Sequence, residues 1–373
     1  MKPPVSRHHA CVHVLTLVAA AAALMAPGCA EEPAAPPTGG PEAAPATGED
    51  LLKPAIAVNL PEKYNTPDGM DLAADGSIVL SCPNFNDASH PAVMLRIDKN
   101  DQVSEIMVLP VHPETKHVGP LGVAVGPDGN LYIADNQSGW SETPASRLLR
   151  VVMEDGKAVR CETLVEGFVQ SNAVCVRDGW VYVTETKLKP DAVPLVSGVY
   201  RFRLTDLDPA KPLKLKPAGD DPHLLTTVET KNPDRRVGAN GMGFDADGNL
   251  YFCNFADAQI LKVTFNMEGE MVSQTIFAEG QGMKSTDGIK FDPRTGDIYV
   301  ADFDGNAVHK VDRTGKVTTL AANGNTTGAG GELDTPSEVC LRGRRLYVSN
   351  IDLPFRDNQY DAPHTISVIE LPE

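Results

Sequence analysis

The sequence is short of positive charge. Its 373 residues include 33 Lys and Arg against 50 Asp and Glu, so the formal net charge is −17. A chain of this charge has no general affinity for nucleic acid phosphates or anionic lipid headgroups, and we expect no nucleic acid partner. Its partners are expected to be small neutral molecules and cations, bound by a monomer. At 42% hydrophobic and 22% charged residues, the composition also excludes a fully disordered or fibrous protein.

Long apolar runs are missing as well, apart from one near the N-terminus. That run, Val14–Met25, follows the basic residues Lys2 and Arg7. It is shorter than the roughly 20 residues that a membrane-spanning helix needs. Small residues stand directly before Cys29, so we interpret residues 1–28 as a signal peptide of the bacterial lipoprotein type and Cys29 as the lipid-bearing residue. The alternative is ordinary cleavage nearby, with no role for Cys29.

The segment after this signal lacks the side chains that build a core. Residues 30–50 contain no aliphatic residue larger than alanine and are rich in proline, glycine and glutamate. Such a composition cannot bury enough apolar surface to fold. We therefore expect residues 29–50 to form a flexible tether. The protein is expected to be exported and held at the bacterial cell envelope by a lipid on Cys29, its only attachment to a membrane.

Several chemical signatures are absent from the rest of the chain. It has no glycine-rich phosphate loop, no nucleophile elbow and no zinc signature, which disfavours nucleotide-driven chemistry. After Cys29 there are five cysteines, an odd number without a CxxC pair, so no thiolate metal cage is expected. We expect most of these cysteines to be structural.

Glycine and proline are abundant, and they punctuate a repeat. The 32 glycines and 30 prolines argue against a helical bundle, because glycine weakens and proline breaks helices. One pattern recurs about every 50 residues: a short apolar strand, a turn rich in Asp and Gly, and a second apolar strand. Its six copies are DGMDLAADGSIVLS from Asp68, LGVAVGPDGNLYIAD from Leu121, NAVCVRDGWVYVTE from Asn172, NGMGFDADGNLYFCN from Asn240, DGIKFDPRTGDIYVAD from Asp287 and SEVCLRGRRLYVSN from Ser337.

This repeat predicts an all-β fold, a six-bladed β-propeller of four-stranded blades over residues 51–373. Each copy is typical of a β-hairpin, because Gly and Asn in the turns accept positive φ. Further strand candidates follow each hairpin, and four strands per repeat of this length indicate a propeller blade. The last copy has only three strands, whereas the apolar stretch Ala55–Leu60 precedes the first copy. We expect that stretch to complete the final blade and close the ring.

The hairpins from Asp68, Asn240 and Asp287 resemble those of the gluconolactonase, regucalcin and luciferin-regenerating family, which is related to paraoxonase-like and strictosidine-synthase-like propellers. In a propeller, all inner strands start from the same face, so their first residues form a ring at the mouth of the central channel. Two carboxylates and two carboxamides in that ring offer oxygen ligands only, which suits a hard divalent cation such as calcium. The ring consists of Asp68, Leu121, Asn172, Asn240, Asp287 and Ser337.

The resemblance implies specific ligands within this ring. The family has Glu on the first blade, Asn on the third and fourth, and Asp on the fifth. These places fall on Asp68, Asn172, Asn240 and Asp287, with the difference that the first acid is the shorter Asp. The family also implies a metal-ligand and general-base role for Asp287, our catalytic candidate. Asn or Asp before Gly also begins turns without binding any ligand, so the turn interpretation stays open.

Long connections should surround the ring, because the second strand of each hairpin returns to its face. They are 83–91, 136–145, 187–196 and 351–363. Clustered long loops of this kind carry binding specificity. Phe85, Trp140, Phe355 and Tyr360 lie in them, and His112 and His117 lie in the connection to the second blade. We take Phe85, His117 and Trp140 as the substrate-binding candidates.

These residues favour one function and leave others open. The leading hypothesis is a metal-dependent hydrolase of a small lactone or ester, in which the cation acts as a Lewis acid on the carbonyl group. The alternative is a propeller that binds a ligand or a protein without catalysis, in which the metal only stiffens the channel. A strictosidine-synthase-like condensation is a third class, although nothing in the sequence indicates an amine substrate.

Overall fold

The computed structural model describes residues 51–216 and 220–372, all within the larger unit of the chain, Pro45–Glu373. The predicted signal peptide (1–28), the lipidation site Cys29 and the tether (29–50) lie outside the described residues. Export and lipid anchoring therefore stay predictions. Within the described residues, no helix has the length and apolar character needed to cross a membrane.

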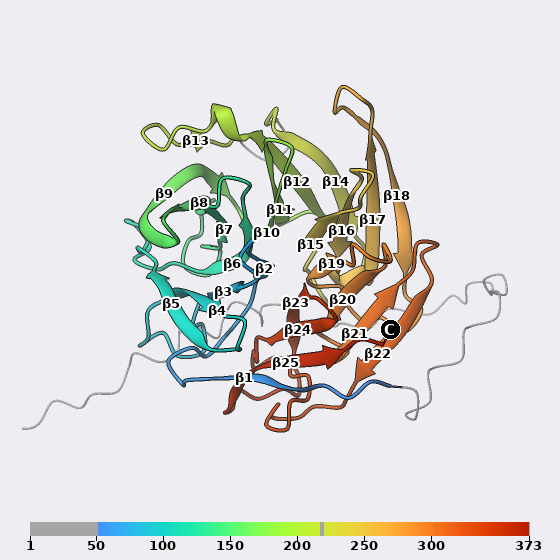
Figure 1. Cartoon of the computed structure of the whole chain (residues 1–373). Helices are drawn as coiled ribbons and strands as arrows, with labels where there is room; N and C mark the ends of the chain where they lie inside the picture. Colours follow the sequence, from blue (N-terminus) through green and yellow to red (C-terminus); the bar gives the residue numbers. More distant parts are fainter. Residues whose placement is uncertain (1–50, 217–219, 373) are drawn as a thin grey trace, which may run out of the picture. The chain divides into compact units, whose positions relative to one another are not determined.

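Six antiparallel sheets stand around a central axis, as the repeat predicted (Figure 1). Blades 1 to 3 contain, from the axis outward, β2 (Met70–Leu72), β3 (Ile78–Cys82), β4 (Val93–Ile97) and β5 (Val103–Val108); β6 (Pro120–Val125), β7 (Leu131–Asp135), β8 (Ser146–Glu154) and β9 (Lys157–Phe168); and β10 (Ser171–Arg177), β11 (Trp180–Lys189), β12 (Leu195–Arg203) and β14 (Leu224–Thr230).

Blades 4 and 5 repeat the pattern, and blade 6 combines the two ends of the described chain. Their strands are β15 (Ala239–Phe244), β16 (Leu250–Asn254), β17 (Gln259–Phe265) and β18 (Met271–Glu279); β19 (Ile289–Phe291), β20 (Ile298–Asp302), β21 (Ala307–Val311) and β22 (Val317–Ala322); and β23 (Pro336–Arg342), β24 (Arg345–Asn350), β25 (His364–Glu370) and β1 (Ala55–Leu60). Two short 3₁₀ helices are η2 (Leu204–Asp206) and η3 (Phe255–Asp257).

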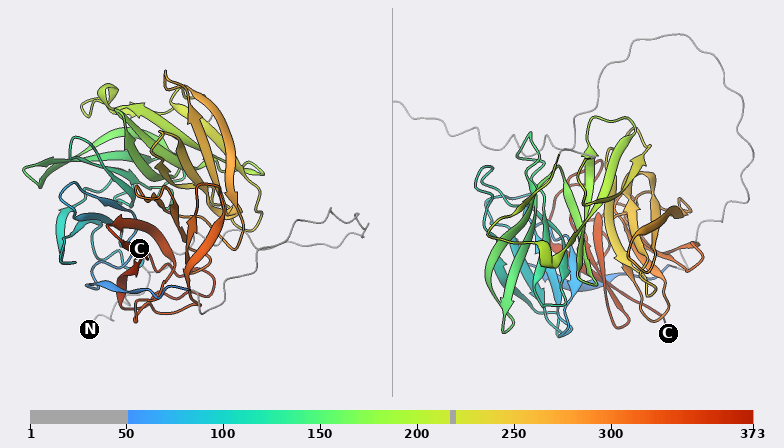
Figure 2. Two further views of the ribbon diagram at one scale, coloured as in Figure 1. Left: turned by 45° about the vertical axis from the view of Figure 1, so that its right-hand side comes forward. Right: turned by 90° about the horizontal axis from the view of Figure 1, so that it is seen from above.

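The predicted closure is confirmed. β1 pairs antiparallel with β25 and becomes the outer strand of blade 6, which Figure 1 shows as a blue strand beside a red one. The strands run between two opposite faces of the propeller (Figure 2). The hairpin turns lie on the face away from the ring, and each contains a glycine with positive φ: Gly76, Gly129, Gly179, Gly248, Gly296 and Gly343.

Among the described residues, six apolar clusters lie between neighbouring blades, one for each pair, and a smaller seventh gathers around Phe255, Phe303 and Ile351. A strand in the middle of a blade therefore faces a core on both sides. This is why β7, β16 and β20 are buried at every residue and read as continuous apolar runs rather than as alternating ones. Every blade is thus held by two neighbours, and the ring closure stabilises all of them.

The loops follow the predictions with one exception. Residues 136–145 and 351–363 connect strands without regular structure, as expected. Residues 187–196 were predicted to form a long loop, and this is wrong: β11 continues to Lys189 and β12 begins at Leu195, so both strands extend above the ring face. The connection after β12 carries β13 (Leu213–Lys214), which pairs parallel with β9 and adds a fifth strand to blade 2.

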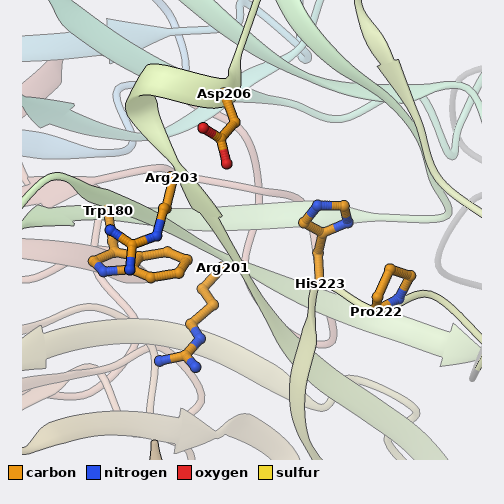
Figure 3. A pocket seen from close by; sticks show the side chains of 6 residues that line it. All are labelled: Trp180, Arg201, Arg203, Asp206, Pro222 and His223. Atoms are coloured by element: carbon orange, nitrogen blue, oxygen red, sulfur yellow. The ribbon is translucent and has the colours of Figure 1, made fainter. Parts of the chain in front are cut away.

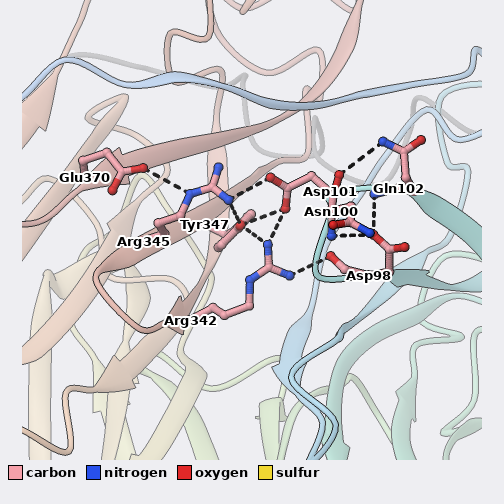
Figure 4. Close-up of polar contacts among 8 residues, drawn as sticks. All are labelled: Asp98, Asn100, Asp101, Gln102, Arg342, Arg345, Tyr347 and Glu370. Atoms are coloured by element: carbon pink, nitrogen blue, oxygen red, sulfur yellow. Dashed lines mark hydrogen bonds and ion pairs between the residues drawn. The ribbon is translucent and has the colours of Figure 1, made fainter.

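A network of polar contacts reinforces the closure on the face opposite the ring (Figure 4). Asp101, in the β4–β5 turn of blade 1, accepts hydrogen bonds from Arg345 Nη1 (2.8 Å) and Tyr347 Oη (2.8 Å) of blade 6. Arg342 also pairs with Asp101 and donates from Nη1 to the carbonyl oxygen of Asp98 (2.8 Å). Partial burial acts to raise the pKa of Asp101, but the hydrogen bonds from Arg345, Tyr347 and Arg342 outweigh it and lower the pKa.

Replacement of Asp101 should therefore destabilise the closed ring. We expect Asp101→Ala to reduce the free energy of unfolding at pH 7 by roughly 1–2 kcal/mol, because two half-buried guanidinium groups lose their carboxylate. Because the pKa of Asp101 is lowered, this difference should be full above pH 4 and shrink as Asp101 is protonated at lower pH.

Urea unfolding followed by circular dichroism measures this difference. The matched control is Glu370→Gln, which removes the exposed pair between Glu370 and Arg345 (3.1 Å) and should cost less than about 0.5 kcal/mol. Equal effects of the two substitutions would contradict the assigned role of Asp101.

Candidate metal centre and active site

The inner strands of the six blades form a closed circle around the axis. β2, β6, β10, β15, β19 and β23 each contact the inner strands of both neighbouring blades. Backbone hydrogen bonds cross from blade to blade at the ring, from Gly241 N to Asp287 O (3.1 Å) and from Gly288 N to Ser337 O (2.8 Å). The six residues predicted to form the ring therefore occupy consecutive places around the channel mouth.

Glycine sets the width of this circle. The residue after the ring position is glycine in four blades, at 69, 122, 241 and 288. A Cβ atom at Gly69 would lie 2.5 Å from the carbonyl oxygen of Leu121, and one at Gly122 would lie 2.6 Å from both the carbonyl oxygen of Asn172 and the Cα of Ala173. Real Cβ atoms do not approach backbone atoms so closely. The inner strands therefore pack closely where a glycine of one strand meets the backbone of the next, and the ring residues are brought together.

The charge of one acidic ring residue acts on another across blades. Burial raises the pKa of Asp68 to about 6, against a hydrogen bond from the Ser337 hydroxyl that lowers it. Burial also raises the pKa of Asp287 well above its ordinary value, and the negative charges of Asp68 and Glu338 raise it further, whereas Arg235 lowers it. Asp68 belongs to blade 1, Asp287 to blade 5 and Glu338 to blade 6, so carboxylates from three blades converge at the mouth.

Glu338 was missed by the sequence reasoning. It follows Ser337 at the place where four other blades have glycine, and a charged residue in that place is the signal that could have identified it. Gly288 makes room for it, because a Cβ atom there would clash with Oε1 and Cα of Glu338. Oε1 accepts a hydrogen bond from Val339 N (2.9 Å). Burial raises the pKa of Glu338 to about 8, although the charge of Lys290 opposes this shift.

The two carboxamides of the ring flank this acidic group. Asn240 is buried and adjoins Asp287 through the bond from Gly241, whereas Asn172 is half-buried on the next inner strand. Within the part of the chain that the structure describes, the side chains of Asn172, Asn240 and Asp287 form no hydrogen bond with another residue. Among the described residues, their oxygen atoms therefore have no hydrogen-bonding protein partner.

A charge pair lies deeper in the channel. Lys290 Nζ of blade 5 lies 3.1 Å from Asp71 Oδ1 of blade 1, and Asp71 Oδ2 accepts a hydrogen bond from Val125 N (2.8 Å). Burial acts to lower the pKa of Lys290, but Asp71 and Glu338 outweigh it and raise the pKa. Asp71 and Lys290 each lie three residues beyond the ring position of their own strand. The positive charge of Lys290 is thus already paired with Asp71, below the mouth.

The three substrate-binding candidates form one aromatic group on the rim. The rings of His117 and Trp140 are stacked, with centroids 4.6 Å apart, and the ring of Phe85 lies 5.8 Å from that of Trp140. All three are half-buried. The amide of Phe85 donates to Thr66 Oγ1 (2.9 Å), two residues before Asp68, so this group stands beside the mouth.

The other candidates on the rim contact neighbouring protein residues and have structural roles. His112 is buried, and its Nδ1 accepts a hydrogen bond from Glu114 N (3.1 Å), which fixes its own loop. Phe355 packs under the guanidinium of Arg235, 3.5 Å from the ring centroid. Arg235 also lies 3.4 Å from Asp304 Oδ1 and is the positive charge that acts on Asp287. It is a further site residue that the sequence pattern did not indicate.

A surface pocket of about 240 Å³ lies away from this site, at the opposite end of blade 3 (Figure 3). There the guanidinium groups of Arg203 and Arg201 lie over the ring of Trp180, 4.3 and 4.7 Å from its centroid. The pocket has no group of unpaired acids. The chemistry of the channel mouth, rather than the size of this hollow, identifies the candidate site.

Comparison with known families agrees with the resemblance of the hairpins. Residues 222–331, which include Asn240 and Asp287, match the SMP-30/Gluconolactonase/LRE-like region. No curated protein matches the chain by sequence.

Solved structures share the fold at low sequence identity. A calcium-binding regucalcin from Agrobacterium tumefaciens matches with a TM-score of 0.58 and 14% identity, over 86% of this chain and 96% of that one. A luciferin-regenerating enzyme matches with 0.56 and 13%, over 85% and 95%. A gluconolactonase from Xanthomonas campestris matches with 0.52 and 18%, over 92% and 100%. At these identities the matches establish the fold and leave the activity to the site.

The glycine circle can be tested directly. Gly122→Ala should cost about 1–3 kcal/mol of unfolding free energy, because its Cβ would press on the backbone of the neighbouring inner strand, which cannot rotate away. Gly324→Ala is the matched control, since a Cβ there meets nothing within 4 Å. Thermal and urea unfolding measure both variants. If the Gly122→Ala protein were as stable as the control, the inner strands would not be packed too closely for a Cβ atom.

Proposed function

We propose that the protein is a divalent-cation-dependent hydrolase of a small lactone or ester, and that the reaction takes place at the channel mouth. The observation that carries this proposal is electrostatic: Asp68, Asp287 and Glu338 belong to three blades, yet burial and the charges of Asp68 and Glu338 raise the pKa of Asp287, beside two carboxamides without hydrogen-bond partners. The SMP-30/gluconolactonase/LRE-like region supports the choice of substrate class.

The donor set suits a calcium ion, because these side chains offer oxygen atoms only. Asp68, Asn172, Asn240 and Asp287 would hold it through side-chain oxygens, and Glu338 offers a further carboxylate that compensates for the short reach of Asp68. Two positively charged side chains lie nearby, but they do not neutralise these acids. Arg235 also forms an ion pair with Asp304, and Lys290 forms one with Asp71. A bound dication would supply the missing charge and polarise the carbonyl group of the substrate. The regucalcin that shares the fold is itself described as calcium-binding.

Asp287 is the proposed general base. Its carboxylate would lie beside the cation and within reach of a water molecule at the substrate carbonyl, which is the place that a general base requires. In the proposed reaction, water forms a bond to the carbonyl carbon and passes a proton to Asp287. The carbon–oxygen bond of the lactone or ester then breaks, and the leaving oxygen takes a proton back. Atoms balance with water as the only co-reactant.

The aromatic group on the rim would select the substrate. Phe85, His117 and Trp140 present an apolar, half-buried surface next to a polar mouth, which suits a small ring compound with one apolar face and one carbonyl group. Arg235, on the other side of Asp287, would favour substrates that carry oxygen or negative charge away from the reacting carbonyl. These roles concern binding and not bond breaking.

Substitution of Asp287 should abolish the reaction. We expect Asp287→Asn to lower kcat/KM at least about a thousandfold, because it removes both the proposed base and a charged ligand. The assay compares calcium with chelator on the purified protein, over aldonolactones, acyl-homoserine lactones and aryl esters. The matched control is Asp247→Asn, an exposed turn residue of blade 4, which should leave kcat/KM unchanged.

The outcomes of this assay distinguish the hydrolase from a propeller that only binds a ligand. Turnover that survives both chelation and Asp287→Asn would contradict the mechanism. Calcium binding with no turnover of any substrate would favour the alternative, a propeller that binds a ligand without catalysis.

Substitution of Trp140 should affect binding instead. Trp140→Ala removes the ring on which His117 stacks, so we expect KM to rise about tenfold with kcat changed less than about threefold. Thr143→Ala, in the same loop but exposed, is the control. A loss confined to kcat would place Trp140 in the chemical step and contradict the assigned role.

A further inference from the structure

Three aspartates meet on the rim of blade 6, apart from the channel mouth. Asp334 lies two residues before β23, Asp352 two residues after β24, and Asp361 in the loop before β25. One carboxylate oxygen of each lies within 4.8 Å of the other two. Asp334 and Asp352 are buried, with 2% and 3% of their surface exposed.

Polar atoms without partners gather around these carboxylates. Among the described residues, nine buried side-chain nitrogen or oxygen atoms lack a hydrogen bond, and five of the nine belong to this small region. They are Asp334 Oδ1, Thr335 Oγ1, Asn358 Oδ1, Asp361 Oδ1 and His364 Nδ1. Unpaired buried polar atoms are rare in folded proteins, so a concentration of them points to a missing partner.

The side chain of Asn358 contacts the group through its amide nitrogen. Its side chain is in a residue with only 8% of its surface exposed, and Nδ2 donates to Asp352 Oδ1 (3.2 Å) and to the carbonyl oxygen of Leu353 (3.1 Å). The carboxamide is therefore held against the carboxylates while Oδ1 has no donor. Thr335, 4% exposed, adds a second neutral oxygen without a partner.

No lysine or arginine within residues 51–216 and 220–372 forms an ion pair with these aspartates. Their single recorded ion-pair partner in that part of the chain is His364, whose Nδ1 lies 3.8 Å from Asp352 Oδ2. Burial lowers the pKa of His364, so its imidazole is neutral at pH 7. Burial and the charge of Asp361 raise the pKa of Asp334 to about 7, and burial and Asp334 raise that of Asp352 to about 8. The group lacks positive charge.

We propose that this group is a second cation site, in which Asp334, Asp352, Asp361 and Asn358 Oδ1 bind calcium. Oxygens on opposite sides of a calcium ion lie about 4.6–5.2 Å apart, so mutual separations within 4.8 Å are those of ligands around one ion. Three carboxylates and a carboxamide form an oxygen-only set, which favours a hard cation. His364 lies outside the set whose ligand atoms meet at this distance.

The site would fix the rim at the ring closure. Asp352 accepts a hydrogen bond at its carbonyl oxygen from Asn86 Nδ2 of blade 1 (2.7 Å), and the carbonyl oxygen of Asp357 accepts one from Asn325 Nδ2 (2.6 Å), in the chain that leaves blade 5. The 351–363 loop thus touches neighbours on both sides. A cation held between this loop and the start of β23 would tie three consecutive blades together on the ring face.

Calcium titration of the purified full chain, first stripped by chelator, tests the site. Asp287→Asn serves as the background, because it disables the proposed channel site. We expect this variant to retain one calcium per chain and to lose it when Asp334→Asn and Asp361→Asn are added. Asp361→Asn alone should weaken calcium binding about tenfold or more. Asp357→Asn, an exposed residue of the same loop, is the matched control and should bind as its parent does.

Thermal unfolding gives a second readout that a merely structural role would not produce. In calcium, Asp334→Asn with Asp361→Asn should lower Tm, whereas in chelator the same pair should leave Tm equal or higher, because it relieves repulsion between buried carboxylates. A lower Tm in both conditions would assign these aspartates a purely structural role and overturn the proposal. An unchanged calcium stoichiometry and affinity would overturn it as well. Neither result depends on turnover or on the channel site.

Discussion

The close approach of six inner strands around one axis is the constraint on which the structure depends. At Gly69 and Gly122 the strands leave no space for a Cβ atom, so their first residues are forced into one small circle. Acids placed there cannot separate. Burial raises the pKa of Asp68, and burial together with the charges of Asp68 and Glu338 raises the pKa of Asp287. Dense packing of the backbone thus holds negative charges close together, and a bound cation would stabilise them.

The same close packing explains how the positively charged side chains are arranged. Lys290 is paired with Asp71 below the mouth, and Arg235 is shared with Asp304 beside it. Neither is free to neutralise the ring acids, so the mouth stays receptive to a dication. The rim of blade 6 repeats this situation on a smaller scale with Asp334, Asp352 and Asp361. In both places, the fold gathers acidic side chains without a lysine or arginine of the described residues that is devoted to them alone.

The sequence was sufficient for features that arise within one repeat. Hairpins, turn glycines and the closing strand Ala55–Leu60 depend on local patterns, and the structure confirms them. Phe85, His117 and Trp140 also meet as one group, as expected for residues in loops on one face of the propeller.

Features that depend on distant contacts were not predictable in this way. Glu338 is a site residue only because Gly288 of the next blade leaves room for it. The three aspartates of blade 6 are separated along the chain and meet through the path of the 351–363 loop. The predicted loop at 187–196 was wrong because pairing between β11 and β12 continues beyond the point where the apolar pattern ends.

The central claim is that the ring acids and carboxamides hold one cation at the channel mouth. The most direct measurement is a crystal structure of the protein soaked with calcium, with the ion located by anomalous scattering. The account predicts an anomalous peak on the channel axis, roughly 2.3–2.6 Å from side-chain oxygens of Asp68, Asn172, Asn240 and Asp287. A mouth without a peak at saturating calcium, with these side chains bonded to protein or water alone, would contradict it.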